Sequence, residues 1–267
     1  MNSYVVHRNG RPADDLAPLA FAGYAHFTAM QIRGRLVRGL DLHLDRLRTA
    51  SVELFGSALS DDLVRDQLRV AVEAGPEDVS LMATVFSRAG EFSGAEAKLE
   101  LLVRTGPPSS GPEGPLKLAT FEHERFKPEL KHVGEPAKTY ALRQAIAAGY
   151  DDAAFVDRQG RLTEGSIWNL AFWDGESVVW PKAPMLTGTT MGIVRRNLQV
   201  PQRTTEISAA DLGGRAGDGR PFVGAVVMNS WSPGIALSGI ADVEFPAAPE
   251  FLDLLHKAYA TEPLTAF

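Results

Sequence analysis

Apolar residues recur at helical spacing in two segments of the first third of the chain. In the segment 41–56 three leucines fall on one face, which predicts a helix that Asp41 caps and Gly56 ends. A second helix is predicted from Ser60, as its cap, to Gly75. Three runs of β-prone residues surround these helices, namely AHFTAMQI, SLMATVFSR and KLELLVR. Helices and strands together predict an α+β arrangement for this part.

The rest of the chain carries more predicted strands than helices. The β-prone runs are LKLATFE, AAFVD, RLTEG, IWNLAFW, SVVW and FVGAVVMN. Asp174 and Gly175 stand between two of them and predict a hairpin. In PAKTYALRQAIAAGY, Pro136 suits the first helical position and Gly149 suits the end. Two further helices are predicted over MGIVRRNL and EFLDLLHKAYA, so this part is of mixed α+β or α/β type.

One segment interrupts both patterns. The run RTGPPSSGPEGP holds four prolines and three glycines in twelve positions, so it suits neither a helix nor a central strand. We interpret it as an interdomain linker. The prediction is a small N-terminal α+β domain over 1–105, a linker over 106–115 and a larger C-terminal domain over 116–267.

Composition narrows the classes of function. Lys and Arg number 27 against 33 Asp and Glu, and this net charge of −6 argues against a nucleic-acid partner. The chain has no cysteine, which excludes disulfides, thiolate metal sites and cysteine nucleophiles, and the six histidines are not spaced as metal ligands. No apolar run approaches the ~20 residues of a membrane span, and the first residues lack the apolar core of a signal peptide. We therefore expect a cytoplasmic protein that acts on or binds a small molecule, with no metal and no membrane partner.

Three features carry candidate chemistry. Lys131 follows an apolar residue between a predicted strand and a predicted helix, where a lowered pKa would let its amine form a Schiff base. Glu164 lies between a turn and a buried-looking strand, where a carboxylate can hold a protonated ring nitrogen. The run LTGTT precedes a helix and offers backbone N–H groups to a phosphate. Taken alone, each feature is also explained by a solvated side chain or an ordinary helix cap.

Together the three features resemble a known family. The segment GYDDAAFVDRQGRLTEGSIWNLAFW is similar to the signature of the class IV aminotransferases, which are fold type IV pyridoxal-phosphate enzymes. The matching positions are Asp151, Asp157, Gly160, Glu164 and Asn169. Lys131 and His132 stand before Asp151 at the spacing of the aminodeoxychorismate lyase branch. FTAMQIRGRLVRGLDLHLDRL, MLTGTTMGIVRR and MNSWSP resemble other motifs of the family, so the likeness spans nearly the whole chain.

The resemblance implies a role for each matching residue. Lys131 would form the Schiff base with pyridoxal phosphate, and Glu164 would pair with the pyridine nitrogen and keep it protonated. Arg46 would bind the phosphate. Further cofactor contacts would come from Thr189, Thr190 and Ser230. The fold implied is a two-domain enzyme with a barrel-like sheet in the larger domain, assembled as a homodimer.

The positions that would contact the substrate differ from the family pattern. Gln31 stands where an arginine is common, and Thr28 replaces an acidic residue. We take these two residues and Trp231 as candidate substrate residues. The activity implied is transamination of a small amino or keto acid. Aminodeoxychorismate lyase is the alternative, and a cofactor-free binding protein is a third possibility.

Overall fold

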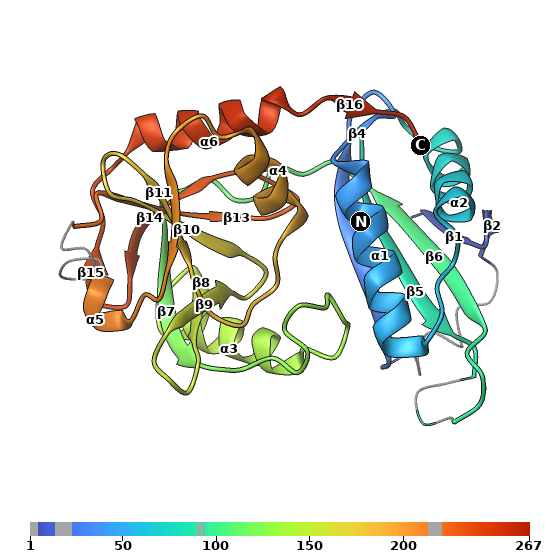
Figure 1. The fold of residues 1–267 in the computed structure, drawn as a ribbon, viewed down its shortest axis with the longest axis horizontal. Coiled ribbons are helices and arrows are strands. Elements are labelled where there is room, and N and C mark those ends of the chain that lie inside the picture. The colour runs from blue at the N-terminus through green and yellow to red at the C-terminus, as the bar shows by residue number, and fades with distance from the viewer. Residues whose placement is uncertain (1–4, 14–22, 90–91, 93, 213–220) are drawn as a thin grey trace. The chain divides into compact units, whose positions relative to one another are not determined.

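The chain forms two units in the computed structural model, which describes residues 5–13, 23–89, 92, 94–212 and 221–267 (Figure 1). Unit 1 consists of Met1–Ser110, Leu130–Gly134 and Pro263–Phe267. Unit 2 consists of Gly111–Glu129 and Glu135–Glu262. Among the described residues no helix is both long and apolar enough to cross a bilayer, and no cluster of His, Asp or Glu is arranged to hold a metal ion.

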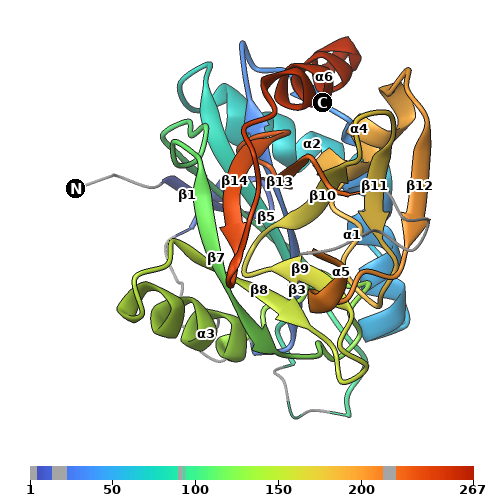
Figure 2. The same cartoon turned by 90° about the vertical axis from the view of Figure 1, so that its left-hand side faces the viewer.

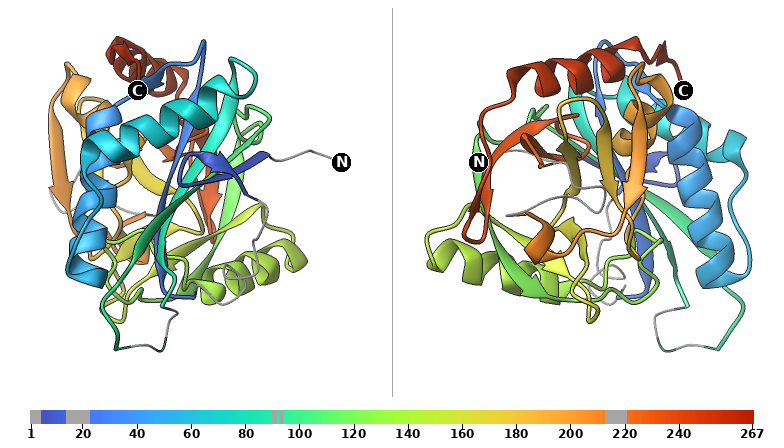
Figure 3. Two further views of the ribbon diagram at one scale, coloured as in Figure 1. Left: turned by 90° about the vertical axis from the view of Figure 1, so that its right-hand side faces the viewer. Right: turned by 60° about the vertical axis from the view of Figure 1, so that its left-hand side comes forward.

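Unit 1 is an antiparallel sheet with two helices packed on it. The strand order is β2-β1-β6-β5-β3, with β1 Val5–Arg8, β2 Arg11–Pro12, β3 Ala25–Ile32, β5 Val79–Ser87 and β6 Leu99–Gly106. The helices α1 Leu40–Phe55 and α2 Asp61–Glu73 lie across one face, as the blue and cyan ribbons of Figure 3 (left) show. Alternate residues of β5 face these helices and are buried, and burial of each large apolar side chain contributes roughly 1.5–3 kcal/mol.

The ends of these helices test the predicted caps. Ser60 accepts a hydrogen bond from the Leu63 amide, and Gly56 ends α1 in a left-handed conformation, so both predictions are confirmed. The prediction that Asp41 caps α1 is wrong. Gly39 occupies the cap position with φ 65°, and Asp41 lies inside the first turn, where its charge still favours the helix dipole.

Unit 2 is built on a curled sheet with helices against it (Figure 2). The strand order is β12-β11-β10-β13-β14-β7-β8-β9, and β15 pairs with β14. The bounds are β7 Leu116–Glu122, β8 Asp152–Val156, β9 Leu162–Gly165, β10 Asn169–Trp173, β11 Val178–Pro181, β12 Gln202–Thr205, β13 Gly224–Met228, β14 Ile235–Ile240 and β15 Val243–Glu244. The helices are α3 Pro136–Ala147, α4 Thr189–Asn197, α5 Ala209–Leu212 and α6 Pro249–Thr261. This sheet confirms the fold class expected from the sequence.

The central strands of unit 2 are buried on both faces. All five residues of β10 are buried, because one apolar cluster fills the inside of the curl and another lies between the sheet and the helices α4 and α6. A strand covered on both sides needs apolar residues in succession rather than in alternation. The run IWNLAFW meets that need, and the hairpin predicted at Asp174 and Gly175 joins β10 to β11.

The units divide between Ser110 and Gly111, inside the Pro- and Gly-rich segment. Two stretches that the sequence analysis assigned to the larger domain group with unit 1 instead. In 130–134, the Lys131 carbonyl accepts the Phe27 amide of β3 at 2.9 Å. At the end of the chain, β16 Leu264–Thr265 pairs with β4 Val37–Arg38. Such pairings join residues far apart in sequence, so composition does not reveal them.

Candidate active site

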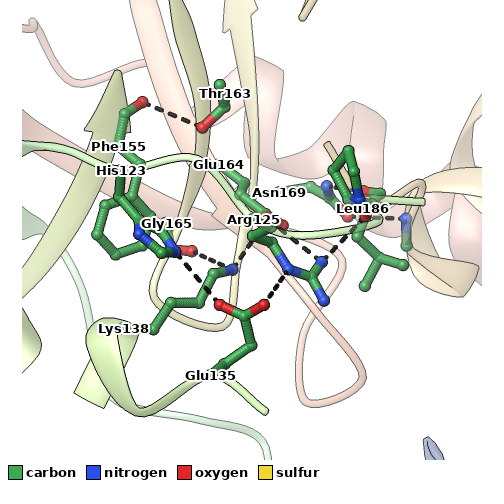
Figure 4. Close-up of polar contacts among 12 residues, drawn as sticks. His123, Arg125, Glu135, Lys138, Phe155, Thr163, Glu164, Gly165, Asn169 and Leu186 are labelled. Atoms are coloured by element: carbon green, nitrogen blue, oxygen red, sulfur yellow. Dashed lines mark hydrogen bonds and ion pairs between the residues drawn. The ribbon is translucent and has the colours of Figure 1, made fainter. Parts of the chain in front are cut away.

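Glu164 of β9 lies at the centre of a buried group of charges (Figure 4). Glu164 is only 5% exposed to solvent. The oxygen Oε1 lies 2.9 Å from the Lys138 amine and 3.4 Å from Nη1 of Arg125. Within the described part of the chain, Oε2 accepts no hydrogen bond. A carboxylate is costly to bury without partners, and here two cations share one of its oxygens.

A second carboxylate extends this group. Nε of Arg125 donates to Oε1 of Glu135 at 3.1 Å, and Oε2 of Glu135 lies 3.2 Å from Nε2 of His123. Nη1 of Arg125 also donates to the Pro128 carbonyl at 3.1 Å. We call Lys138, Arg125, Glu164 and Glu135 the buried ion cluster. Its two cations and two anions balance, which is what allows four charges to be buried together.

The amine of Lys138 is perturbed by this environment. Burial lowers its pKa, and the nearby Arg125 lowers it further, while the charge of Glu164 opposes both. The amine also lies 3.5 Å from the Gly165 carbonyl and 5.5 Å from the centre of the Phe155 ring. Lys138 could not be recognised from the sequence, because a lysine at the start of a helical segment carries no local sign of burial.

The two aspartates of the signature, Asp151 and Asp157, accept hydrogen bonds from backbone amides. Oδ2 of Asp151 accepts the Lys117 amide at 2.7 Å and so fixes the start of β8 to β7. Asp157 accepts the amides of Gln159 and Arg161, and Nε of Arg161 donates to it at 2.8 Å. Burial raises the pKa of Asp157, but these hydrogen bonds outweigh it and the net pKa is lowered. Both carboxylates are engaged by backbone amides, whereas Oε2 of Glu164 accepts no hydrogen bond in the described part of the chain.

Asn169 holds the turn that begins α4. Its Nδ2 donates to the Leu186 carbonyl at 2.6 Å, and its Oδ1 accepts the Gly188 amide at 3.0 Å. The helix starts at Thr189, and the first amides of a helix have no partner within it. Thr189 and Thr190 therefore present backbone N–H groups at a positive helix end, an arrangement suited to an anion.

Lys131 and Arg46 both belong to unit 1. The segment of Lys131 runs beside β3, and its amine lies 4.8 Å from the centre of the Phe27 ring. Arg46 lies on α1 and is half-buried, and its charge helps to lower the pKa of the buried His43. Unit 1 thus carries the predicted Schiff-base lysine and the predicted phosphate arginine, while unit 2 carries Glu164 and the start of α4.

The candidate substrate residues of unit 1 are engaged in its own structure. Thr28 is fully buried, with Oγ1 2.6 Å from Nδ1 of His43. Nε2 of Gln31 donates to Oγ of Ser80 at 2.9 Å, and its Oε1 accepts the Ser109 amide at 3.0 Å. Gln31 therefore ties the start of the connecting segment to the sheet.

Ser230 and Trp231 follow β13 in a tight turn of unit 2. Trp231 is 38% exposed and packs edge-on against Trp168, with 5.7 Å between the ring centres. Trp168 is itself buried, and its indole N–H donates to Oδ2 of Asp152 at 2.6 Å. Trp231 therefore combines a fixed position with an accessible ring, whereas Ser230 is half-buried in the turn.

Comparison with known proteins settles the family. The sequence matches the family model described as amino-transferase class IV over residues 25–235, which is most of the chain. The protein is a class IV aminotransferase family member. The family and the pyridoxal-phosphate-dependent enzyme class implied by the sequence are thereby confirmed.

Solved structures of class IV aminotransferases and related enzymes share the fold. A putative 4-amino-4-deoxychorismate lyase from Legionella pneumophila is 19% identical, with a TM-score of 0.79 and coverage of 91% of this chain and 93% of that one. A branched-chain amino acid aminotransferase from Thermobaculum terrenum in its PLP form is 17% identical, with a TM-score of 0.80 and coverage of 97% and 93%. A PLP-bound hypothetical aminotransferase from Mycobacterium tuberculosis is 19% identical, with a TM-score of 0.78 and coverage of 96% and 99%. No curated protein matches the chain.

Proposed function

We propose that this class IV family member is a pyridoxal-phosphate-dependent aminotransferase for a small amino acid and keto acid. The observation that carries the proposal is Glu164, a buried carboxylate with one oxygen held by two cations and the other without a hydrogen bond in the described part of the chain. That second oxygen is the acceptor that a protonated pyridine nitrogen needs.

The groups of unit 2 fit both ends of the cofactor. Glu164 suits the ring nitrogen, and the backbone amides of Thr189 and Thr190 suit the phosphate. Asn169 supports this fit, because it fixes the turn from which α4 starts and lies five residues after Glu164 in the chain. In the proposal Arg46 and Ser230 add contacts to the phosphate.

Lys131 is the amine that we propose bonds to the cofactor's aldehyde. When bound, pyridoxal phosphate supplies an electron sink that stabilises negative charge on the α-carbon of an amino acid. The amine of Lys131 would also serve as the general base that takes the α-proton of the substrate. Glu164 keeps the ring nitrogen protonated throughout, and the exposed Trp231 is the candidate to line the substrate site.

Borohydride reduction followed by tryptic mapping tests the lysine assignment. A reduced adduct on Lys131 blocks cleavage there and yields the peptide FKPELKHVGEPAK, whereas an adduct on Lys138 yields HVGEPAKTYALR. We expect the first peptide, and we expect the Lys131→Ala variant to lose the adduct. Purified protein without pyridoxal absorbance after incubation with the cofactor would instead support the cofactor-free binding protein.

Aminodeoxychorismate lyase is the second candidate. The sequence Lys131-His132, placed as in that branch, favours it, as does the likeness to the Legionella pneumophila protein. Incubation with aminodeoxychorismate separates the two activities. Release of pyruvate would establish the lyase, while conversion of the bound cofactor to its pyridoxamine form by an amino donor, without pyruvate, would establish the aminotransferase.

A homodimer and a cytoplasmic location belong to the same proposal, on the strength of the family resemblance. Sedimentation of the purified protein tests the dimer, and fractionation of the source cells tests the location.

A further inference from the structure

We propose that Lys138 and Arg125 are positioning residues that hold Glu164 by its Oε1 and so direct Oε2 to the ring nitrogen of the cofactor. This inference rests on the proposed function. It assigns to Lys138 a role that differs from that of Lys131, although both are lysines in the same stretch of sequence.

The geometry at Glu164 is one-sided. Both cations contact Oε1, at 2.9 Å from the Lys138 amine and 3.4 Å from Arg125. A carboxylate held at one oxygen by two charge-assisted contacts has little freedom to rotate. Its other oxygen is then fixed in direction before a ligand arrives, and a fixed acceptor binds a ligand more tightly because less freedom is lost on binding.

Arg125 is in turn held by hydrogen bonds to groups other than Glu164. Glu135 accepts from its Nε, the Pro128 carbonyl accepts from its Nη1, and His123 contacts the far oxygen of Glu135. The side chain of Arg125 is only 5% exposed. The guanidinium is therefore held by Glu135 and Pro128 independently of its contact with Glu164.

Lys138 depends on Glu164 in a way that a surface lysine does not. It lies in the first turn of α3, where the helix dipole disfavours a cation, and it is 8% exposed. Its contact with Glu164 offsets both the unfavourable helix dipole and the cost of burying the charge. The two residues thus stabilise each other, and loss of either charge leaves the other in an unfavourable place.

The test measures how much Lys138→Met weakens cofactor binding, once with Glu164 present and once in the Glu164→Gln variant. The probes are pyridoxal phosphate and an analogue in which a methyl group replaces the aldehyde, so that the analogue reports ring and phosphate contacts without a covalent bond. We expect Lys138→Met to weaken binding of the analogue about tenfold or more, the size of a lost charge-assisted contact. In the Glu164→Gln background the same substitution should weaken it less than about threefold, because the carboxylate that Lys138 orients is absent.

Two further variants separate positioning from general effects. Arg143→Met removes one positive charge from an exposed position on the same helix and should leave binding unchanged. Lys138→Arg keeps the charge and should restore binding to within about threefold of the unchanged protein. Thermal unfolding of each variant without cofactor, compared with its binding, shows whether the fold is retained.

The outcomes distinguish this inference from the proposed function. If the unchanged protein binds neither probe, both fail. If it binds both, but Lys138→Met binds the analogue equally well or loses the same factor in both backgrounds, the positioning role is refuted and the function stands. A borohydride adduct on Lys138 would also refute it, because the amine would then be the covalent anchor.

Discussion

Gly188 leaves the space that the Asn169 side chain occupies: a Cβ added to Gly188 would lie 2.1 Å from Oδ1 of Asn169. The close approach lets Asn169 bond to the turn on both sides, at Leu186 and at Gly188. The direction of the α4 start, and with it the proposed phosphate contact, therefore depends on one residue without a side chain.

Gly188→Ala is expected to break the hydrogen bonds that Asn169 makes to Leu186 and Gly188. The added methyl group must displace Asn169, so we expect a loss of about 1–3 kcal/mol in the free energy of unfolding. Pyridoxal phosphate binding should weaken as well. Urea unfolding and cofactor titration measure the two effects. Gly75→Ala is the control, since a Cβ there meets no atom within 4 Å, and equal losses in both variants would contradict the prediction.

Two buried histidines are expected to make unit 1 sensitive to acid. Burial lowers the pKa of His43 to about 3, with a further contribution from Arg46, and burial lowers that of His26 to about 4, from 6.5 in each case. Because the folded pKa values lie below the unfolded ones, the unfolded chain binds more protons as pH falls. The contribution of the two histidines to the free energy of unfolding is therefore fully present above about pH 6.5. Below that pH it declines by up to about 1.4 kcal/mol per pH unit for each histidine.

Amide replacements test this dependence. Nδ1 of His43 bonds to Thr28 and Nε2 of His26 bonds to Ser51, so His43→Asn and His26→Gln keep a polar atom near each bonded position. Each variant should lose less stability than the unchanged protein between about pH 7 and about pH 5 in urea unfolding. An unaltered pH dependence in both variants would show that other groups cause it.

Glu262 is expected to be a major contact between the end of α6 and α4. It accepts from Nε of Arg196 at 2.8 Å and from Nδ2 of Asn197 at 2.9 Å. Glu262→Ala leaves these donors without their acceptor, so we expect a loss of about 1–3 kcal/mol. Calorimetry measures it. Asp253→Ala, at an exposed position beyond the first turn of the same helix, should change stability by less than about 0.5 kcal/mol.

Trp168 is expected to matter more for stability than its neighbour Trp231. Trp168→Phe removes the N–H that the buried Asp152 accepts, which should cost about 1–3 kcal/mol. Trp231→Phe retains an aromatic ring at a half-exposed position and should cost less than about 0.5 kcal/mol. Chemical unfolding followed by circular dichroism, which does not depend on the tryptophans, compares the two.

The parts of the fold that follow from local pattern were predictable, and those that depend on distant pairing were not. Ser60 and Pro136 mark helix starts through chemistry that acts within a few residues, and both predictions hold. The hairpin of β1 and β2 turns at Asn9 and Gly10, both with positive φ, and this local turn pair was a further signal in the sequence. The strands β12 and β16 were missed because they are only four and two residues long and are defined by their pairing, and β14 was missed because Ser238 and Gly239 interrupt its apolar run.

The candidate site shows the same limit. Glu164 was found because the signature fixes its place in sequence. Arg125, Glu135 and Lys138 were not, because nothing in their own stretch of sequence shows that these charges are buried, and two of them meet the distant Glu164 only in the folded unit. A buried charge is recognised by its partners, and partners are a tertiary property.

The two units are interleaved along the chain, and this sets the order in which they can be completed during synthesis. The edge of β3 receives its neighbouring backbone only when residues 130–134 have been made, and β4 receives β16 only when residues 264 and 265 have been made. Unit 2 ends at Glu262, before that last strand. Most of unit 1 is thus made before unit 2 and yet is completed after it, and a fragment cut at Ser110 would lack two of its own backbone partners.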